Sequence, residues 1–155
     1  MDVTASMDAP RPPADLMPWV DVLDRYPSWM PLVHRVDDPE AADEEAAVPG
    51  GSGPARRVEL RARLGPFARS KRLRMVRTVY DPDGGHVRFE RAETDGRAHS
   101  PWVLDVRVEP TADGCRLDMH LHYGGALWTG GVMERVLADQ IVAGRERLLS
   151  LINGD

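Results

Sequence analysis

The segment from Gly131 to Ile152 constrains the fold more than any other part of this 155-residue chain. Large apolar residues recur in it at spacings of three and four, with charged residues between them, so it is predicted to form one amphipathic helix. The apolar stripe comprises Met133, Val136, Leu137, Ile141, Leu148, Leu151 and Ile152, with the small Gly144 on the same side. At about 1.5 Å per residue the helix is about 33 Å long. A stripe of that length needs a β-sheet to pack against.

The rest of the chain supplies the strands of that sheet. From residue 56 to residue 123, apolar and polar residues alternate in stretches that end at turn sequences, which is typical of antiparallel hairpins. Residues 2–7 alternate in the same way, and residues 32–36 form another short strand. Between these two strands the sequence predicts a helix over residues 14–23 and then one short, proline-bounded helical turn.

The predicted order is one strand, two short helices, six strands in antiparallel succession and the long helix. It indicates an α+β helix-grip fold, in which a curved antiparallel sheet of about seven strands wraps round the C-terminal helix. The length and the 42% hydrophobic content fit a single domain over residues 1–155. The formal net charge of −5 comes from an acidic, aperiodic segment at residues 37–54, which is predicted to be a mobile loop.

Several classes of protein are disfavoured by what the sequence lacks. No run of about eighteen apolar residues is present, so no transmembrane segment is predicted. The N-terminus lacks a basic region followed by an apolar one, and we therefore expect a cytoplasmic protein. The single Cys115 excludes an internal disulfide and a multi-cysteine zinc site. Asp118, His120 and His122 share a strand face, but it is the face opposite the apolar residues, so we predict neither a metal site nor a cofactor.

Three features of the sequence carry a family resemblance. They are the motif Asp24-Arg25-Tyr26-Pro27-Ser28-Trp29-Met30-Pro31 after the first helix, the strand that ends in Tyr80-Asp81-Pro82, and the terminal amphipathic helix. Together they resemble the polyketide cyclase/dehydrase and lipid-transport family of the START-like (SRPBCC) superfamily, over nearly the whole chain. The resemblance implies a hydrophobic cavity between the sheet and the long helix. It does not imply one reaction, because similar proteins cyclise polyketides, bind coenzyme Q or lipids, or act as ribosome-association toxins.

Arg77 departs most sharply from the strand pattern, because it shares the parity of Leu73, Met75 and Val79. That parity points Arg77 at the cavity, where an unpaired charge costs several kcal/mol and must meet a carboxylate, water or a ligand. Arg91 repeats the pattern one strand later. The resemblance adds a role, since an inward arginine on this strand is thought to anchor substrate oxygens in polyketide aromatase/cyclases. The alternative is a local bulge, or strand ends that release both side chains to solvent.

The predicted cavity wall combines residues of the strands and the long helix. The candidate ligand-binding residues are Trp29, Met75, Arg77, Phe89, Arg91, Trp102, Leu104, Met119, Tyr123, Leu137, Ile141 and Gly144. If the protein is an enzyme, Arg77 stabilises an enolate oxygen and Tyr123 donates or relays a proton. Alternatively, each aromatic residue of this set packs in the core and does not contact a ligand. Gly144 marks either a hollow in the helix wall or a close approach of another segment.

Three functions remain open at this point. The first interpretation is binding of a small hydrophobic ligand, such as a lipid, an isoprenoid or a polyketide-like molecule. The second is a polyketide cyclase/aromatase-like enzyme. The third is a toxin-like or regulatory interaction domain, because residues 56–77 hold nine basic residues against Glu59 alone. Most of these have outward parity, which is common on solvated strands, so nucleic acid is not the favoured partner. A homodimer through the edge strand at residues 32–36 stays an alternative.

Overall fold

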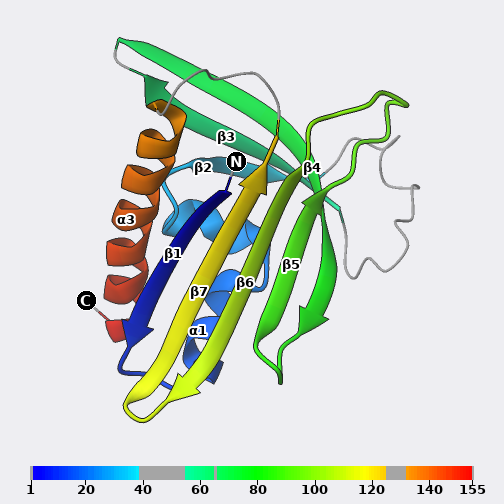
Figure 1. The fold of residues 1–155 in the computed structure, drawn as a ribbon. Coiled ribbons are helices and arrows are strands. Elements are labelled where there is room, and N and C mark those ends of the chain that lie inside the picture. The colour runs from blue at the N-terminus through cyan, green and yellow to red at the C-terminus, as the bar shows by residue number, and fades with distance from the viewer. Residues whose placement is uncertain (1, 39–54, 65, 125–131, 155) are drawn as a thin grey trace.

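The computed structural model describes residues 2–38, 55–64, 66–124 and 132–154 (Figure 1). The elements in chain order are β1 (Asp2–Ala9), α1 (Pro13–Val20), the 3₁₀ helix η1 (Leu23–Ser28), β2 (Val33–Asp37), β3 (Arg56–Leu64), β4 (Phe67–Asp81), β5 (His86–Arg91), β6 (Trp102–Thr111), β7 (Gly114–Tyr123) and α3 (Val132–Asn153). The predicted α+β helix-grip fold is confirmed. The predicted loop lies outside the described residues from residue 39 on, as does the side chain of Leu137.

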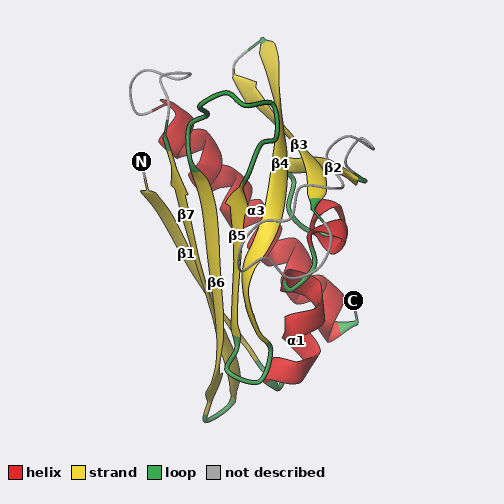
Figure 2. Cartoon of the chain, turned by 90° about the vertical axis from the view of Figure 1, so that its right-hand side faces the viewer, coloured by secondary structure: helices red, strands yellow, loops and turns green. Residues whose placement is uncertain are grey.

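The seven strands form one antiparallel sheet in the order β1-β7-β6-β5-β4-β3-β2. The first strand therefore pairs with the last, in an unbroken register from Asp2 opposite His122 to Ala9 opposite Cys115. Helix α3 lies across the sheet and contacts β1 near one edge and β3 near the other (Figures 1 and 2). The sheet thus curls round the helix. Ile141, Leu148 and Ile152 of the predicted stripe pack against the core, whereas Leu151 is exposed. No helix in the described ranges is long and apolar enough to cross a membrane.

Strand alternation places the core on the concave face. On β6 the buried residues Trp102, Val106 and Val108 point inward, and β7 contributes Leu117 and Met119 from the neighbouring positions. Helix α3 adds its completely buried Leu148, and α1 packs against β6 and β7. Because each strand turns every second side chain inward, a polar residue with inward parity must find a partner inside or at the rim.

Helix α1 ends at Val20, three residues before the predicted end, and η1 follows as a separate helix. Tyr26 from η1 donates a hydrogen bond from its hydroxyl to the Val20 carbonyl, at 2.9 Å. This bond satisfies one of the acceptors that the end of a helix leaves open. Tyr26 is buried, so the bond fixes η1 against the end of α1 and holds both helices under the sheet.

Strand β4 contains a register shift between Arg77 and Val79. Arg77 lies opposite Phe89, whereas Val79 lies opposite Arg88 and Tyr80 opposite Val87. One extra residue exchanges the two faces of a strand, so after the bulge Tyr80 takes the face of Arg77 and Val79 the other. The prediction that Val79 shares the face of Arg77 is wrong for this reason.

Candidate ligand-binding cavity

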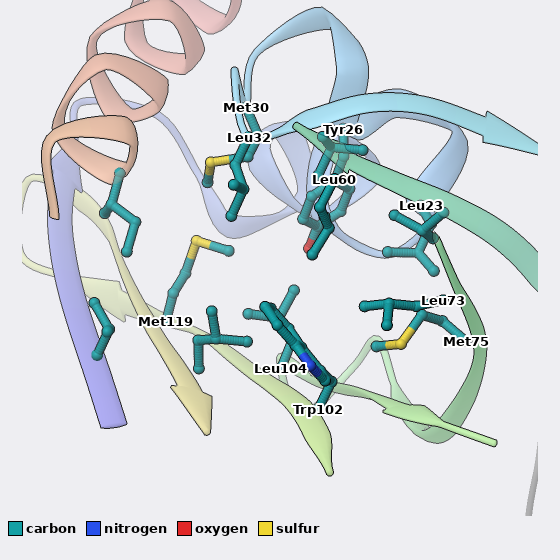
Figure 3. A pocket seen from close by; sticks show the side chains of 15 residues that line it. Leu23, Tyr26, Met30, Leu32, Leu60, Leu73, Met75, Trp102, Leu104 and Met119 are labelled. Atoms are coloured by element: carbon teal, nitrogen blue, oxygen red, sulfur yellow. The ribbon is translucent and has the colours of Figure 1, made fainter. Parts of the chain in front are cut away.

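An apolar cavity opens between the concave face of the sheet and the helices (Figure 3). About 80 Å³ of it is open to the centres of water-sized molecules, and roughly 10–15 Å³ on this measure holds one water. The cavity therefore has room for a small organic ligand or for a segment of a longer one. The described residues that line it are Val3, Leu23, Tyr26, Met30, Leu32, Val33, Val58, Leu60, Leu73, Met75, Trp102, Leu104, Met119, Leu121 and Ile141.

The shape of the cavity follows from the strands and from the residue types. Inward positions on β3, β4, β6 and β7 converge because the sheet is curved, and Ile141 of α3 closes the opposite side. Met30, Met75 and Met119 contribute to the wall from three separate segments (Figure 3). Methionine is unbranched and polarisable, and it adapts to irregular shapes. A wall with three such residues can fit ligands of somewhat different outline.

Only two lining residues carry a side-chain polar atom within the described part of the chain. The Tyr26 hydroxyl is bonded to the Val20 carbonyl, and burial raises its pKa far above the ordinary range. The indole Nε1 of Trp102 is buried and has no hydrogen-bond partner among the described residues. A buried donor without a partner is uncommon in folded proteins. The cavity is thus apolar, with one donor in its wall that the described residues leave unsatisfied.

Five of the predicted ligand-binding residues lie in the lining: Met75, Trp102, Leu104, Met119 and Ile141. The prediction missed the other ten lining residues, although the signal was present for several of them. Val58 and Leu60 share the apolar parity of β3, for example, and both line the cavity. Tyr26 and Met30 come from the η1 segment and the turn after it, where no regular period shows which side chains point inward.

The other predicted aromatic residues lie around the cavity rather than in its main lining. Trp29 donates its indole N–H to the Trp19 carbonyl at 2.9 Å and borders a smaller neighbouring hollow. Phe89 packs edge-on against Tyr26, with ring centroids 6.1 Å apart. Tyr123, the predicted proton donor, stacks against Trp102 at 5.1 Å. None of these three residues belongs to the lining of the main cavity, and their direct contact with a ligand stays a prediction.

Arg77 does not line the cavity. Its Nη1 donates to the carbonyl oxygen of Asp21 at 2.8 Å, and its guanidinium carbon lies 3.7 Å from the centre of the Tyr80 ring. The bulge after Arg77 brings Tyr80 to the same face, which makes this stacking possible. Arg77 keeps its inward register opposite Phe89, but its contacts lie at the end of α1, and the predicted substrate-anchoring role stays a prediction. Arg77 links β4 to the end of α1.

Arg91 has inward parity, opposite Met75, but its charge is neutralised at the end of the sheet. Its Nε lies 3.0 Å from an oxygen of Glu93, and its Nη1 donates to the Ser100 carbonyl at 3.3 Å. Glu93 also accepts from Arg57 Nη1, at 3.1 Å, and from a backbone N–H. Burial raises the pKa of Glu93, but these hydrogen bonds outweigh it and hold the pKa below its usual range. Arg91 is thus a buried ion-pair partner, contrary to its predicted place in the lining.

Gly144 lies where helix α3 comes close to the turn after η1. A Cβ at this position would lie 3.2 Å from both the Trp29 carbonyl oxygen and the Met30 sulfur. Such a distance is shorter than most contacts of real Cβ atoms. Of the two interpretations of Gly144, the close approach is therefore correct and the hollow is not.

The histidine pair of β7 lies on the convex face, away from the cavity. His120 Nε2 and His122 Nδ1 both contact Asp2 Oδ1, at 2.8 and 3.0 Å. Hydrogen bonds from the two imidazoles lower the pKa of Asp2. In the described part of the chain, no three His, Cys, Asp or Glu residues are arranged to hold a metal ion. The pair ties β7 to β1.

A curved antiparallel sheet that closes on a long helix over an apolar cavity defines the helix-grip class of proteins. Residues 1–151 match the family described as polyketide cyclase / dehydrase and lipid transport. The chain belongs to this family. No functionally curated protein matches the chain by sequence.

Solved structures agree with this fold. A START superfamily protein from Mycobacterium smegmatis is similar with a TM-score of 0.70 and 12% identity, over 99% of this chain and 97% of that one. TTHA0849 from Thermus thermophilus is similar with a TM-score of 0.66 and 16% identity, over 97% and 99%. The di-domain ARO/CYC StfQ from the steffimycin biosynthetic pathway is similar with a TM-score of 0.66 and 13% identity, over 99% of this chain and 50% of that one. At such identities the similarity shows the fold alone.

Proposed function

We propose that the protein binds a small hydrophobic molecule, such as a lipid, an isoprenoid or a polyketide-like compound, in the cavity between the sheet and α3. The observation that carries this proposal is the composition of the lining, which is aliphatic and aromatic at every described position. Burial of apolar surface contributes roughly 25 cal/mol per Å² and needs no directional contacts. Such a wall suits a ligand that is held by shape and burial.

Binding is favoured over cyclase-type catalysis by where the charged residues lie. Steering a reactive chain requires positioned acids, bases or cations at the reacting atoms. Arg77 binds the Asp21 carbonyl, and Arg91 is paired with Glu93. Within the described lining no residue is an acid, a histidine, a lysine or an arginine. The family includes both kinds of activity in its description, and this lining supports the one without chemistry.

The test uses a neutral apolar dye, N-phenyl-1-naphthylamine, and its displacement by 1-dodecanol. Leu104 lines the cavity, so Leu104→Trp fills part of it with an indole ring that is much larger than the leucine side chain. The matched control is Val103→Trp, one residue earlier on β6 and half-buried on the opposite face. We expect Leu104→Trp to weaken dye binding about tenfold or more, which corresponds to about 1.4 kcal/mol or more, while Val103→Trp binds like the wild type.

Thermal unfolding of both variants shows whether each is folded. If a folded Leu104→Trp variant bound the dye and the alcohol like the wild type, the cavity would not be the binding site. If the wild type bound neither compound, the proposal of a neutral apolar binding site would be wrong.

A further inference from the structure

A second hollow, lined by basic side chains, adjoins the apolar cavity. The two share Leu32, Leu60 and Trp102 in their walls. The hollow adds Arg61, Ala62, Arg69, Ser70 and Lys71, so its described lining holds three cations and no carboxylate. Figure 3 shows the Trp102 ring projecting into the apolar cavity, and Trp102 also lines the second hollow. The apolar stems of three cationic side chains therefore border the apolar space on this side.

Lys71 is the half-buried cation of this hollow, and it continues the inward-facing row of residues on β4. It alternates with Leu73 and Met75 on β4, and it pairs with Leu60 of β3, all three of which line the cavity. Its ammonium nitrogen lies 5.8 Å from the centre of the Trp102 ring. The side chain thus points inward along the concave face, over the residue that both spaces share.

The charge of Lys71 has no carboxylate partner in the described part of the chain, where no hydrogen bond or ion pair of its side chain is found. Two neighbouring cations, Arg61 and Arg91, differ in this respect. Arg61 Nη2 lies 4.0 Å from an oxygen of Glu59, and Arg91 is paired with Glu93. Burial and then the charge of Arg91 lower the pKa of Lys71, and the more distant charge of Glu93 offsets them only in part. A lowered pKa is expected for a cation in an unfavourable environment.

We propose that the ligand is an amphipathic acid, whose apolar body fills the cavity and whose carboxylate pairs with Lys71 beside Trp102. This inference rests on the proposed function, since it names the class of ligand for the same cavity. Arg61 and Arg69 are exposed, whereas Lys71 is half-buried, so one partly buried ammonium group faces the ligand. It matches one negative charge, which points to a carboxylate rather than to a phosphate dianion. A partly buried ion pair is screened less than an exposed one. The unsatisfied Trp102 Nε1 lies in the same wall, and an oxygen of the ligand gives it an acceptor.

The test compares dodecanoate with 1-dodecanol at pH 7, each below the concentration at which it aggregates. The two compounds share a twelve-carbon chain and differ in the charge of one end. We expect the wild type to bind dodecanoate about tenfold more tightly than the alcohol, a difference of about 1.4 kcal/mol. Lys71→Met should abolish this preference and leave the affinity for the alcohol within about twofold. Lys71→Arg, which keeps the charge, should retain most of the preference.

The matched control is Arg72→Gln, which removes a positive charge one residue along β4, on the exposed face. The Arg72→Gln variant should keep the preference for the acid. If this variant lost the preference, the effect would come from the general charge of the protein, and the assignment to Lys71 would be overturned. Equal affinities of the wild type for acid and alcohol would overturn the inference and leave the proposed function standing. If neither compound bound, the proposed function itself would fail. The wild-type comparison decides between these outcomes even if Lys71→Met does not fold.

Discussion

The guanidinium of Arg77 donates a hydrogen bond to the carbonyl oxygen of Asp21 at 2.8 Å, across 56 residues of sequence. Asp21 caps the end of α1, and Arg77 lies at the start of the bulge in β4. The bond therefore joins the helical layer to the sheet at the edge of the molecule, outside the cavity. An arginine that resembles a substrate anchor by strand parity is a structural link in this protein.

Arg77→Met should lower the free energy of unfolding by about 1–2 kcal/mol, because it removes this hydrogen bond and the stacking of a cation on Tyr80. Affinity for 1-dodecanol should change less than about twofold. Chemical denaturation and dye displacement measure the two effects. Arg72→Met, on the exposed face of the same strand, is the control and should leave both unchanged. If the Arg77→Met protein were as stable as the wild type but no longer bound the ligand, Arg77 would be a ligand-binding residue rather than a structural one.

Glu93→Gln should destabilise the fold by about 2 kcal/mol, because Glu93 is the carboxylate partner of two arginines, Arg57 and Arg91, near the end of the sheet. Its side chain is 10% exposed and that of Arg91 is 9% exposed, so the charge of Arg91 loses its partner where water replaces it poorly. The exposed Glu109, on β6, provides the control Glu109→Gln. Urea denaturation at pH 7 compares the three proteins. Equal midpoints for the two variants would show that the Glu93 ion pairs contribute nothing to stability.

The contribution of Glu93 should disappear in acid. The pKa of Glu93 is lower in the folded protein than in the unfolded chain, where it is about 4.3. The folded state therefore gains stability above the unfolded value and loses it as the pH falls through the folded value. Accordingly, the difference in urea midpoint between the wild type and Glu93→Gln should be largest near pH 7 and shrink below about pH 4. Other carboxylates affect both proteins alike, so a difference that is constant with pH would contradict this origin.

Gly144→Leu should destabilise the protein by about 1–3 kcal/mol, the usual cost of forcing extra atoms into a packed contact. The obstacle is the Trp29 carbonyl oxygen, 3.2 Å from the position of a Cβ, which belongs to the backbone and cannot rotate away. Ala138→Leu, at an exposed position of the same helix, should be tolerated. Thermal unfolding separates the two variants. If the Gly144→Leu protein were stable but no longer bound 1-dodecanol, the interpretation that Gly144 leaves space for the ligand in the helix wall would be correct.

The sequence by itself determined the elements and the side of each element that is buried. Alternation of apolar residues placed Trp102 and Leu104 on one face of β6, and the spacing of three and four placed Ile141 on the inner face of α3. Both patterns follow from the local geometry of the backbone, which repeats every two residues in a strand and every 3.6 in a helix. Together with the motif at residues 24–31, they were sufficient to predict the fold and the family.

The tertiary structure alone decided what the inward polar residues do. Parity placed Arg77 and Arg91 on the inner face of their strands, and Lys71 has the same parity on β4 although it was not among the predicted site residues. The Asp21 carbonyl and the Tyr80 ring hold the guanidinium of Arg77 outside the cavity lining, and Glu93 pairs with Arg91. Lys71 was left beside Trp102 without a carboxylate among the described residues. Partners such as Asp21 are brought close only by the folded chain, so no local period of the sequence reveals which charge remains for a ligand.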